Sequence, residues 1–492
     1  MTLESHGDGG EGGRSQSSPG CKERRKGQDV RTASRVKRLM AVLPVLALLA
    51  SGGAAQTGPP ASEKAPPTDA AVRDVVTKDM NEVARLVKQG KTSEAYLRSV
   101  AGTHMELWRK AETLGMPDGV FLVGLCHFRG IAVAEDYAEA AKRFTRAAEG
   151  GCAMAQSNLG YCYQNGVGVE KHLGQALKWY RKAANQGDGL GEFNLGTCYR
   201  FGIGVPRDGE TAVSWYRKAA DQGYAIAQFS LGVCCEEGDG MPRDEAAAVK
   251  WYLKAAEQGL VDAESNLGDC YRDGKGVRAD PAEALGWYLK AAEQGKAYAQ
   301  FEVATAYTFG DGVEKDDGEA AKWYGLAAEQ GDAAAQYGLG VCYHYGRGVG
   351  ANDQTAVSLY RKSAEAGYGQ AQLTLGMCYE DGTGMPKDQA EALKWYRRGA
   401  EQGHAGSQLN LGRCYEKGKG VEEDDEEAVR WYRKAADQGD PEALYELGRC
   451  YENGIGVGAN FDEAVRCYQA AAKAGNKDAK EALRRLGAEP AQ

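Results

Sequence analysis

The sequence predicts an all-α solenoid made of antiparallel helix pairs that repeat every 36 residues. Counting back from Gly412 in steps of 36 reaches a glycine at every position down to Gly124 except one, where Ala304 stands. The same step places seven of the eight tryptophans in one column, from Trp179 to Trp431. Such a fixed period is typical of a solenoid, in which each repeat packs only on its neighbours.

Length and charge limit the kinds of function. A chain of 492 residues would form about three compact domains, but ten repeats between residues 116 and 475 replace them with one linear array. The chain carries 69 acidic and 60 basic residues, for a net charge of -9. This balance argues against a nucleic-acid partner, because such proteins use a strongly basic face.

The N-terminal residues predict an exported protein. Residues 1–38 are polar and basic, which predicts a disordered leader. Residues 39–50 read LMAVLPVLALLA, too short a run for a stable membrane span, and small residues follow. Residues 39–55 therefore predict a signal-peptide apolar region with its cleavage site, and a periplasmic or secreted protein. The alternative is an uncleaved tether, or a misassigned start in a cytoplasmic protein.

The array has a degenerate cap at each end. Residues 56–68 form a Pro-rich linker. In residues 69–115, Val72, Val76, Met80 and Val83 follow a helical spacing, and Trp108 precedes the equivalent position of the first repeat by 36 residues. This predicts N-terminal helices and a capping repeat. Residues 476–492 predict a C-terminal capping helix and tail.

Each repeat carries signals for two helices. The first helix ends at a Gly-x-Gly loop, such as Gly418 and Gly420, whose first glycine can adopt the left-handed conformation that closes a helix. The second helix begins at a column that is Asp or Asn in nine of ten repeats, and in seven repeats Glu or Gln follows three residues later, which predicts a capping box. This column consists of Asp136, His172, Asp208, Asp244, Asp280, Asp316, Asn352, Asp388, Asp424 and Asn460.

One face of the first helix hardly varies between repeats. In the last repeat it holds Ala443, Leu447, Gly448, Cys450 and Tyr451, whose spacings of three and four predict a packing face. A mid-helix glycine costs roughly 1 kcal/mol relative to alanine, so its recurrence predicts the close approach of another helix backbone. In the sixth repeat alanine replaces both the glycine and the cysteine, which predicts a local change of packing.

These motifs resemble the Sel1-like repeat, a relative of the tetratricopeptide repeat. The shared pattern is A-x-Q-x-x-L-G-x-x-Y-x-x-G-x-G-V followed by D-x-x-E-A-x-x-W-Y-x-x-A-A-x-x-G, and it covers residues 116–475. The resemblance implies a right-handed α-solenoid that acts as an adaptor or scaffold. It also implies that client proteins bind along the concave side, which the first helices line.

The cysteines predict packing rather than chemistry. Nine of the 13 share one column of the packing face. Equivalent positions in neighbouring helices lie about 8–10 Å apart, beyond the roughly 7 Å limit for a disulfide. Some exported Sel1-like proteins are cysteine-rich, with two cysteines per repeat and reported β-lactam binding or hydrolysis. A cell-envelope enzyme or ligand-binder of that type is therefore the alternative function, although this chain has one column cysteine per repeat.

No catalytic, cofactor-binding or metal-binding residues are predicted. The six histidines show no metal-ligand spacing. The one Ser-x-x-Lys, Ser34 to Lys37, lies in the leader. The Gly-x-Gly pairs lack the Gly-Lys-Ser/Thr of a phosphate-binding loop. The helical phase of the Trp-Tyr columns favours core packing over a carbohydrate-stacking ladder.

The remaining candidate is the variable face of the first helix, which we call the first-helix stripe. It comprises the positions six before, two before, one after and five after the glycine column, and it lies opposite the predicted packing face. Aromatic residues at Phe201, Phe309 and Tyr345 favour a role in recognition. We therefore predict a non-enzymatic scaffold that binds a protein or peptide client, of unknown identity and oligomeric state. The predicted contact residues are Leu190, Asn194, Thr197, Phe201, Ile226, Ser230, Val233, Glu237, Tyr298, Glu302, Thr305, Phe309, Ala334, Gly338, Val341 and Tyr345.

Overall fold

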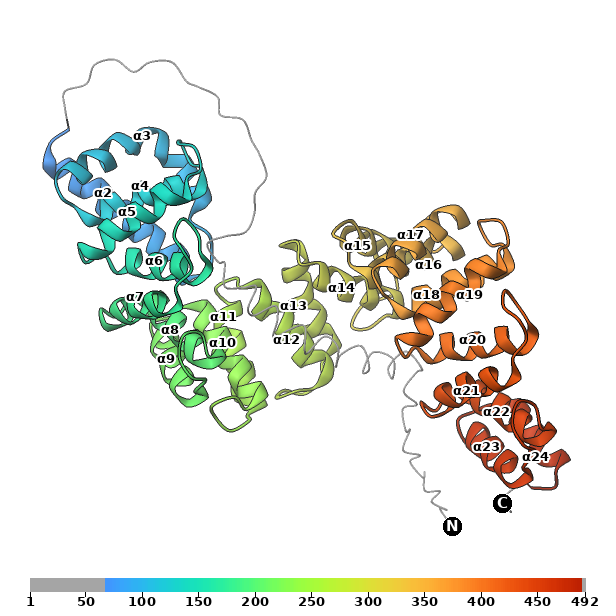
Figure 1. Cartoon of the computed structure of the whole chain (residues 1–492). Coiled ribbons are helices and arrows are strands. Elements are labelled where there is room, and N and C mark those ends of the chain that lie inside the picture. Colours follow the sequence, from blue (N-terminus) through green and yellow to red (C-terminus); the bar gives the residue numbers. More distant parts are fainter. Residues whose placement is uncertain (1–66, 489–492) are drawn as a thin grey trace, which may run out of the picture. The chain divides into compact units, whose positions relative to one another are not determined.

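A computed structural model describes residues 67–488, which form 23 helices and no strand (Figure 1). The predicted all-α solenoid of paired helices is confirmed. The predicted leader, the signal region and the linker up to residue 66 lie outside the described residues, as do residues 489–492. Within residues 67–488, no helix combines the length and the apolar character needed to cross a bilayer.

The chain divides into two compact halves, Met1–Ala227 and Gln228–Gln492, called here the N-terminal and C-terminal halves. The N-terminal half contains α2 (Asp69–Lys88), α3 (Glu94–Thr113), α4 (Pro117–Arg129), α5 (Tyr137–Glu149), α6 (Ala153–Asn165), α7 (Leu173–Asn185), α8 (Gly189–Phe201) and α9 (Gly209–Asp221). Helix α10 (Ala225–Glu237) begins just before the boundary.

The C-terminal half continues the alternation of first and second helices. It contains α11 (Glu245–Ala256), α12 (Val261–Asp273), α13 (Pro281–Glu293), α14 (Ala297–Phe309), α15 (Asp317–Glu329), α16 (Ala333–Tyr345), α17 (Asp353–Glu365), α18 (Gly369–Asp381), α19 (Gln389–Glu401), α20 (Ala405–Lys417), α21 (Asp425–Ala436), α22 (Pro441–Asn453), α23 (Phe461–Lys473) and α24 (Lys477–Arg485). Even-numbered helices from α4 to α22 are first helices, and each packs on the second helix that follows it.

The predicted N-caps of the second helices are present. In the capping box, only the hydrogen bond from the N-cap side chain is formed. The side chain of Asp424 accepts a hydrogen bond from the Glu427 N–H at 2.9 Å, as the N-cap prediction requires. The Asp424 N–H donates to the carbonyl of Tyr415 instead of to the Glu427 side chain. Glu427 pairs with Arg430 at 2.8 Å. The same carbonyl contact recurs in every repeat, so the N-cap of the second helix is tied to the end of the first.

Both glycines of the Gly-x-Gly loop adopt the left-handed conformation, where only the first was predicted to. At the second glycine a Cβ atom would collide with the preceding repeat. At Gly348, whose φ is +70°, it would stand 1.9 Å from the carbonyl oxygen of Asp317 in α15. The loop therefore sets the contact between consecutive repeats as well as the turn within one.

The glycine column of the first helix faces the helix backbone that the sequence predicted, and a tyrosine ring of that helix lies still closer. A Cβ atom on Gly412 would lie 2.6 Å from Cε1 of Tyr432, which is fully buried. Backbone is the more distant neighbour, since the carbonyl oxygen of Ala428 lies at 3.2 Å. The glycine thus leaves room for the tyrosine of the Trp-Tyr pair.

The sixth repeat accommodates its alanines through a compensating glycine. Ala304 occupies the glycine column and is fully buried. The ring of Tyr324 packs on Gly338 of the next first helix, where a Cβ atom would stand 2.8 Å from Cε1. The predicted change of packing therefore consists of the alanine at residue 304 and the glycine at residue 338.

A ladder of buried amides links successive repeats. Gln300 donates from Nε2 to the carbonyl of Ala292 at 3.1 Å and accepts from Gln330 at 2.7 Å. Glu264 occupies the equivalent position one repeat earlier and accepts from Gln294 at 2.8 Å, but an ionised carboxylate has no proton to donate. Burial raises the pKa of the Glu264 carboxyl, against the opposing effects of Lys290 and Gln294.

Replacing Glu264 by glutamine is expected to stabilise the C-terminal half by about 1 kcal/mol at pH 7, because the amide restores a donor. The raised pKa means that the folded state binds the proton more tightly than the unfolded state does. The wild-type contribution of Glu264 is therefore lost as pH rises above the unfolded pKa of about 4.3. Urea midpoints measured from pH 4 to pH 8 should show a gain that grows with pH. The exposed neighbour Glu293→Gln should show none.

Candidate partner-binding face

In the N-terminal half, the first-helix stripe is mostly covered. Thr197 is buried, donates to the Phe193 carbonyl at 3.0 Å and lies 3.1 Å from the hydroxyl of Tyr216. Ile226 is buried, and Phe201 is half-buried beneath the guanidinium of Arg200. Leu190 and Asn194 are half-buried.

In the C-terminal half, some residues of the stripe are buried and others are exposed. Ser230, Val233, Glu302, Thr305 and Ala334 are buried, whereas Glu237, Phe309 and Tyr345 are exposed. Tyr298, Gly338 and Val341 are half-buried.

We predicted that the whole stripe lies opposite the packing face. This prediction is wrong for seven of its residues, which are buried. Buried members are Thr197, Ile226, Ser230, Val233, Glu302, Thr305 and Ala334. The physical reason is that successive first helices contact each other, as α6 with α8 and α18 with α20, so the positions between them meet a neighbouring repeat. The position five after the glycine column lies at the helix end and escapes this contact. The binding role of the stripe stays a prediction.

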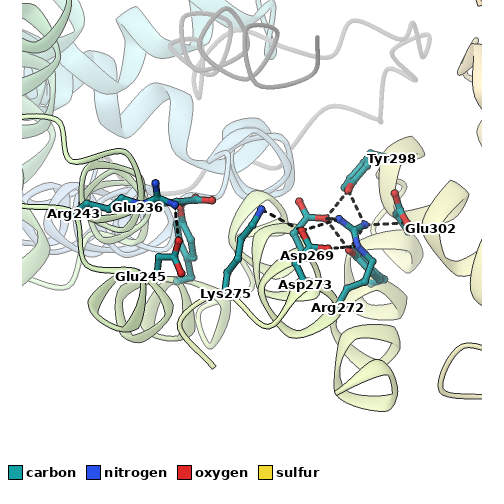
Figure 2. A network of polar contacts seen from close by, with 11 residues as sticks. Glu236, Arg243, Glu245, Asp269, Arg272, Asp273, Lys275, Tyr298 and Glu302 are labelled. Carbon is teal, nitrogen blue, oxygen red and sulfur yellow. Dashed lines mark hydrogen bonds and ion pairs between the residues drawn. The ribbon is translucent and has the colours of Figure 1, made fainter. Parts of the chain in front are cut away.

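A partly buried polar network joins α12 and α14 along the stripe (Figure 2). Arg272 of α12 pairs with Asp269 and with Asp273 on its own helix, and with Glu302 of α14 at 3.1 Å. Tyr298 of α14 donates to Asp269 at 2.5 Å. Burial opposes the charge of Arg272, but Glu302 and Asp269 outweigh it and raise the pKa of the guanidinium. Two predicted contact residues, Tyr298 and Glu302, thus hold α12 and α14 together.

Beyond this network, three large apolar side chains are exposed on consecutive first helices. Phe309 ends α14 and is 56% exposed, Tyr345 ends α16 and is 63% exposed, and Met377 of α18 is 45% exposed. The His344 ring stands edge-on to Tyr345 with centroids 4.6 Å apart. The prediction missed Met377, although it lies one residue after the glycine column and so belongs to the first-helix stripe. We call these three residues the apolar row.

Further along, charged residues occupy the stripe and the positions beside it, and the charges beside the stripe bridge successive repeats. Each carboxylate four residues after the glycine column accepts from the tyrosine of its own repeat and from a cation of the next. Glu380 accepts from Tyr396 at 2.8 Å and from Lys419 at 2.5 Å. Glu452 accepts from Tyr468 and pairs with Arg485 at 2.7 Å. Glu416, Tyr432 and Arg449 repeat this arrangement. The sequence signal was a glutamate recurring at 236, 380, 416 and 452.

A polar cavity of about 290 Å³ lies along α20 at the start of this charged segment, with α18 on one side and α22 on the other. It is lined by Glu380, Asn410, Arg413, Cys414, Lys417, Lys419 and Glu446. Most of its lining comes from α20, the first helix that follows α18, and α18 carries Met377 of the apolar row.

The cysteines of the shared column belong to the packed interior of the array. The column cysteines are buried, and burial raises the pKa of the Cys126 and Cys450 thiols to about 12. Within residues 67–488, every cysteine is free and no three His, Cys, Asp or Glu side chains are grouped to hold a metal ion.

The Trp-Tyr columns divide between core and surface. The tyrosines are core residues, as predicted, but most of the tryptophans are only half-buried. A lysine three residues later covers the ring in five repeats; Lys434, for example, lies 3.6 Å from the centroid of Trp431. The lysine occupies the face that a stacked sugar would need.

The fold defines a helical-repeat solenoid made of paired helices. The Sel1 repeat family model matches the chain ten times, at residues 117–152, 153–188, 190–224, 225–260, 261–296, 297–332, 333–368, 369–404, 405–440 and 441–476. The chain belongs to the Sel1 repeat family.

Two solved structures are similar over most of their own lengths. One is c5321, a protective antigen of uropathogenic Escherichia coli strains, with a TM-score of 0.67 and 32% identity over 84% of this chain and 90% of that chain. The other is a Sel1 repeat protein from Oxalobacter formigenes, with a TM-score of 0.52 and 34% identity over 63% of this chain and 90% of that chain. No curated protein matches the sequence.

Proposed function

We propose that this protein is a non-enzymatic scaffold that binds a segment of a partner protein along the first helices of its C-terminal half. The observation that carries the proposal is the apolar row, three large exposed side chains at stripe positions of consecutive first helices. Large side chains, aromatic ones above all, contribute most of the binding energy at protein interfaces. Sel1-like and tetratricopeptide-like solenoids are typically interaction scaffolds, which supports the same reading.

The contacts that flank the apolar row favour binding by preorganisation. The Arg272 network fixes α12 to α14 on one side, and the Glu380–Lys419 pair joins α18 to the repeat of α20 on the other. Side chains at fixed spacing lose little conformational freedom when a partner binds, which raises affinity without new contacts. A client would thus meet a prearranged surface.

Simultaneous replacement of Phe309, Tyr345 and Met377 by alanine is expected to weaken client binding by at least about 30-fold, since large apolar anchors contribute about 2 kcal/mol or more. Affinity capture from an extract of the native organism, quantified by mass spectrometry, measures the loss. Helical circular dichroism should not change, because all three side chains are exposed.

The matched control is Phe461→Ala. Phe461 is 55% exposed, like Phe309, but it begins the second helix α23. Capture should be unaffected by this change. Equal loss in the control, or an unchanged set of captured proteins in the triple variant, would remove the apolar row from the binding surface.

Export of the protein is a further part of the proposal. It is supported by the composition of residues 39–55 and by the description of the similar Escherichia coli protein as a protective antigen. N-terminal sequencing of the mature chain tests it: a start near Gln56 supports export, and retention of residues 1–35 contradicts it. The alternative, a β-lactam-binding protein of the cysteine-rich type, is less well supported, because the cysteines of residues 67–488 are free and do not form the disulfides of that type.

A further inference from the structure

We propose that the client is an extended peptide with an apolar side chain that binds on the apolar row. About three residues before or after it, an acidic side chain of the peptide enters the cavity along α20. This inference rests on the proposed function, because it assigns the chemistry of the client at the same face. It is carried by the hydrogen-bonding state of each charged group in that cavity.

Every carboxylate oxygen in the cavity already has a partner. Glu380 Oε1 accepts from Lys419 and its Oε2 accepts from Tyr396. Glu446 Oε1 accepts from Arg413 and its Oε2 accepts from Arg449. The cavity therefore offers little to a basic ligand.

Two cationic donors in the same cavity remain available. Lys417 ends α20, is exposed and pairs with no carboxylate among the described residues. Arg413 uses Nε and Nη2 for Glu446 and Glu442, which leaves Nη1 without a hydrogen bond. The two side chains line the same cavity and can each donate a further hydrogen bond, so a ligand that supplies an acceptor fits, and a carboxylate also complements their charge.

Spacing connects this cavity to the apolar row. Met377 of α18 and Lys417 of α20 belong to the stripe on neighbouring first helices, which contact each other. Packed helices lie about 8–10 Å apart, and an extended peptide advances roughly 3.3 Å per residue. The two client side chains should therefore be about three positions apart.

A second acidic position is not expected. Asp381 occupies the position of Lys417 one repeat earlier and is exposed. Its carboxylate repels an acidic side chain over α18, so the preference should be confined to one position of the peptide.

The test is selection from a phage-displayed library of random 12-residue peptides, which present side chains but no free C-terminal carboxylate at the binding site. Wild type should enrich peptides with an aromatic or aliphatic residue and an Asp or Glu two to four positions away, on the order of tenfold over the unselected library. Lys417→Glu should keep the apolar preference and replace Asp or Glu by Lys or Arg. The control Lys473→Glu, an exposed lysine at the end of the second helix α23, should select as wild type does.

The outcomes separate the two proposals. Enrichment of apolar peptides without an acidic preference, or an acidic preference that survives Lys417→Glu, overturns the inference and leaves the scaffold function standing. No enrichment on wild type, or undiminished enrichment on the variant that lacks Phe309, Tyr345 and Met377, overturns the proposed function and the inference with it.

Discussion

Replacing Gly348 by alanine is expected to destabilise the C-terminal half by about 3 kcal/mol or more, because the new side chain meets both an unfavourable φ and a backbone atom. The new methyl group meets the Asp317 carbonyl at 1.9 Å, and a backbone atom cannot rotate away as a side chain can. Relief requires α15 and the loop to separate, which breaks the contact between consecutive repeats. Urea unfolding followed by circular dichroism measures the change.

Two nearby glycines serve as controls that separate the cost of the left-handed φ from the cost of the steric clash. Gly331 has φ of +85° with nothing within 4 Å of an added Cβ, so Gly331→Ala should cost only the roughly 1 kcal/mol of left-handed strain. Gly350 has open space and no positive φ, so Gly350→Ala should stay within about 0.5 kcal/mol of wild type. If Gly331→Ala and Gly348→Ala prove equally destabilising, the inter-repeat contact contributes nothing.

Replacing Asp79 by alanine is expected to loosen the packing of α2 on α3 at the N-terminal end of the array, at a local cost of about 3 kcal/mol. The Asp79 carboxylate has no exposed surface and accepts from Tyr96 at 2.5 Å, from Trp108 at 2.8 Å, and contacts His104 Nδ1 at 2.9 Å. Burial and this hydrogen bond raise the pKa of the Tyr96 hydroxyl, which stays a donor. Removal of the carboxylate leaves these donors without an acceptor.

Hydrogen exchange is the suitable measurement, because a repeat array can open at one end while the rest stays folded. Amides of α2 and α3 should exchange faster by about two orders of magnitude, and those of the C-terminal half should not change. Asp74→Ala, an exposed residue of the same helix, is the control. Asp79→Asn should recover part of the protection, since its amide oxygen still accepts. Unchanged exchange in α2 and α3 would refute the role of Asp79.

The features that were predictable from the sequence are those set within one repeat. An N-cap such as Asp424 acts on the next turn of its own helix, and a helix-closing glycine such as Gly418 acts on its own loop. Their columns therefore predict the helix pairs and their boundaries. The role of the second loop glycine was not predicted, because the group that excludes a Cβ there, such as the Asp317 carbonyl at Gly348, belongs to the preceding repeat.

The candidate site was harder to predict for the same reason. Helical phase places Thr305 and Phe309 on one stripe, but it cannot show that the neighbouring first helix covers the former and leaves the latter exposed. Asp79 continues the spacing of Val72 and Val76, so it was predictable as a core position. The role of its carboxylate as a hydrogen-bond acceptor was not predictable, because its three partners in α3 come close to it only in the folded protein.

The contact made by the second loop glycine also constrains how such a protein can change in length. Gly420 of one loop rests on the start of α19 in the repeat before it, while the N-cap of α21 is tied to Tyr415 at the end of α20. An insertion or deletion inside a loop would move one of these contacts relative to the other. Duplication or loss of a whole 36-residue segment preserves both, so gene-level growth and shrinkage of the array are expected to occur in complete repeats.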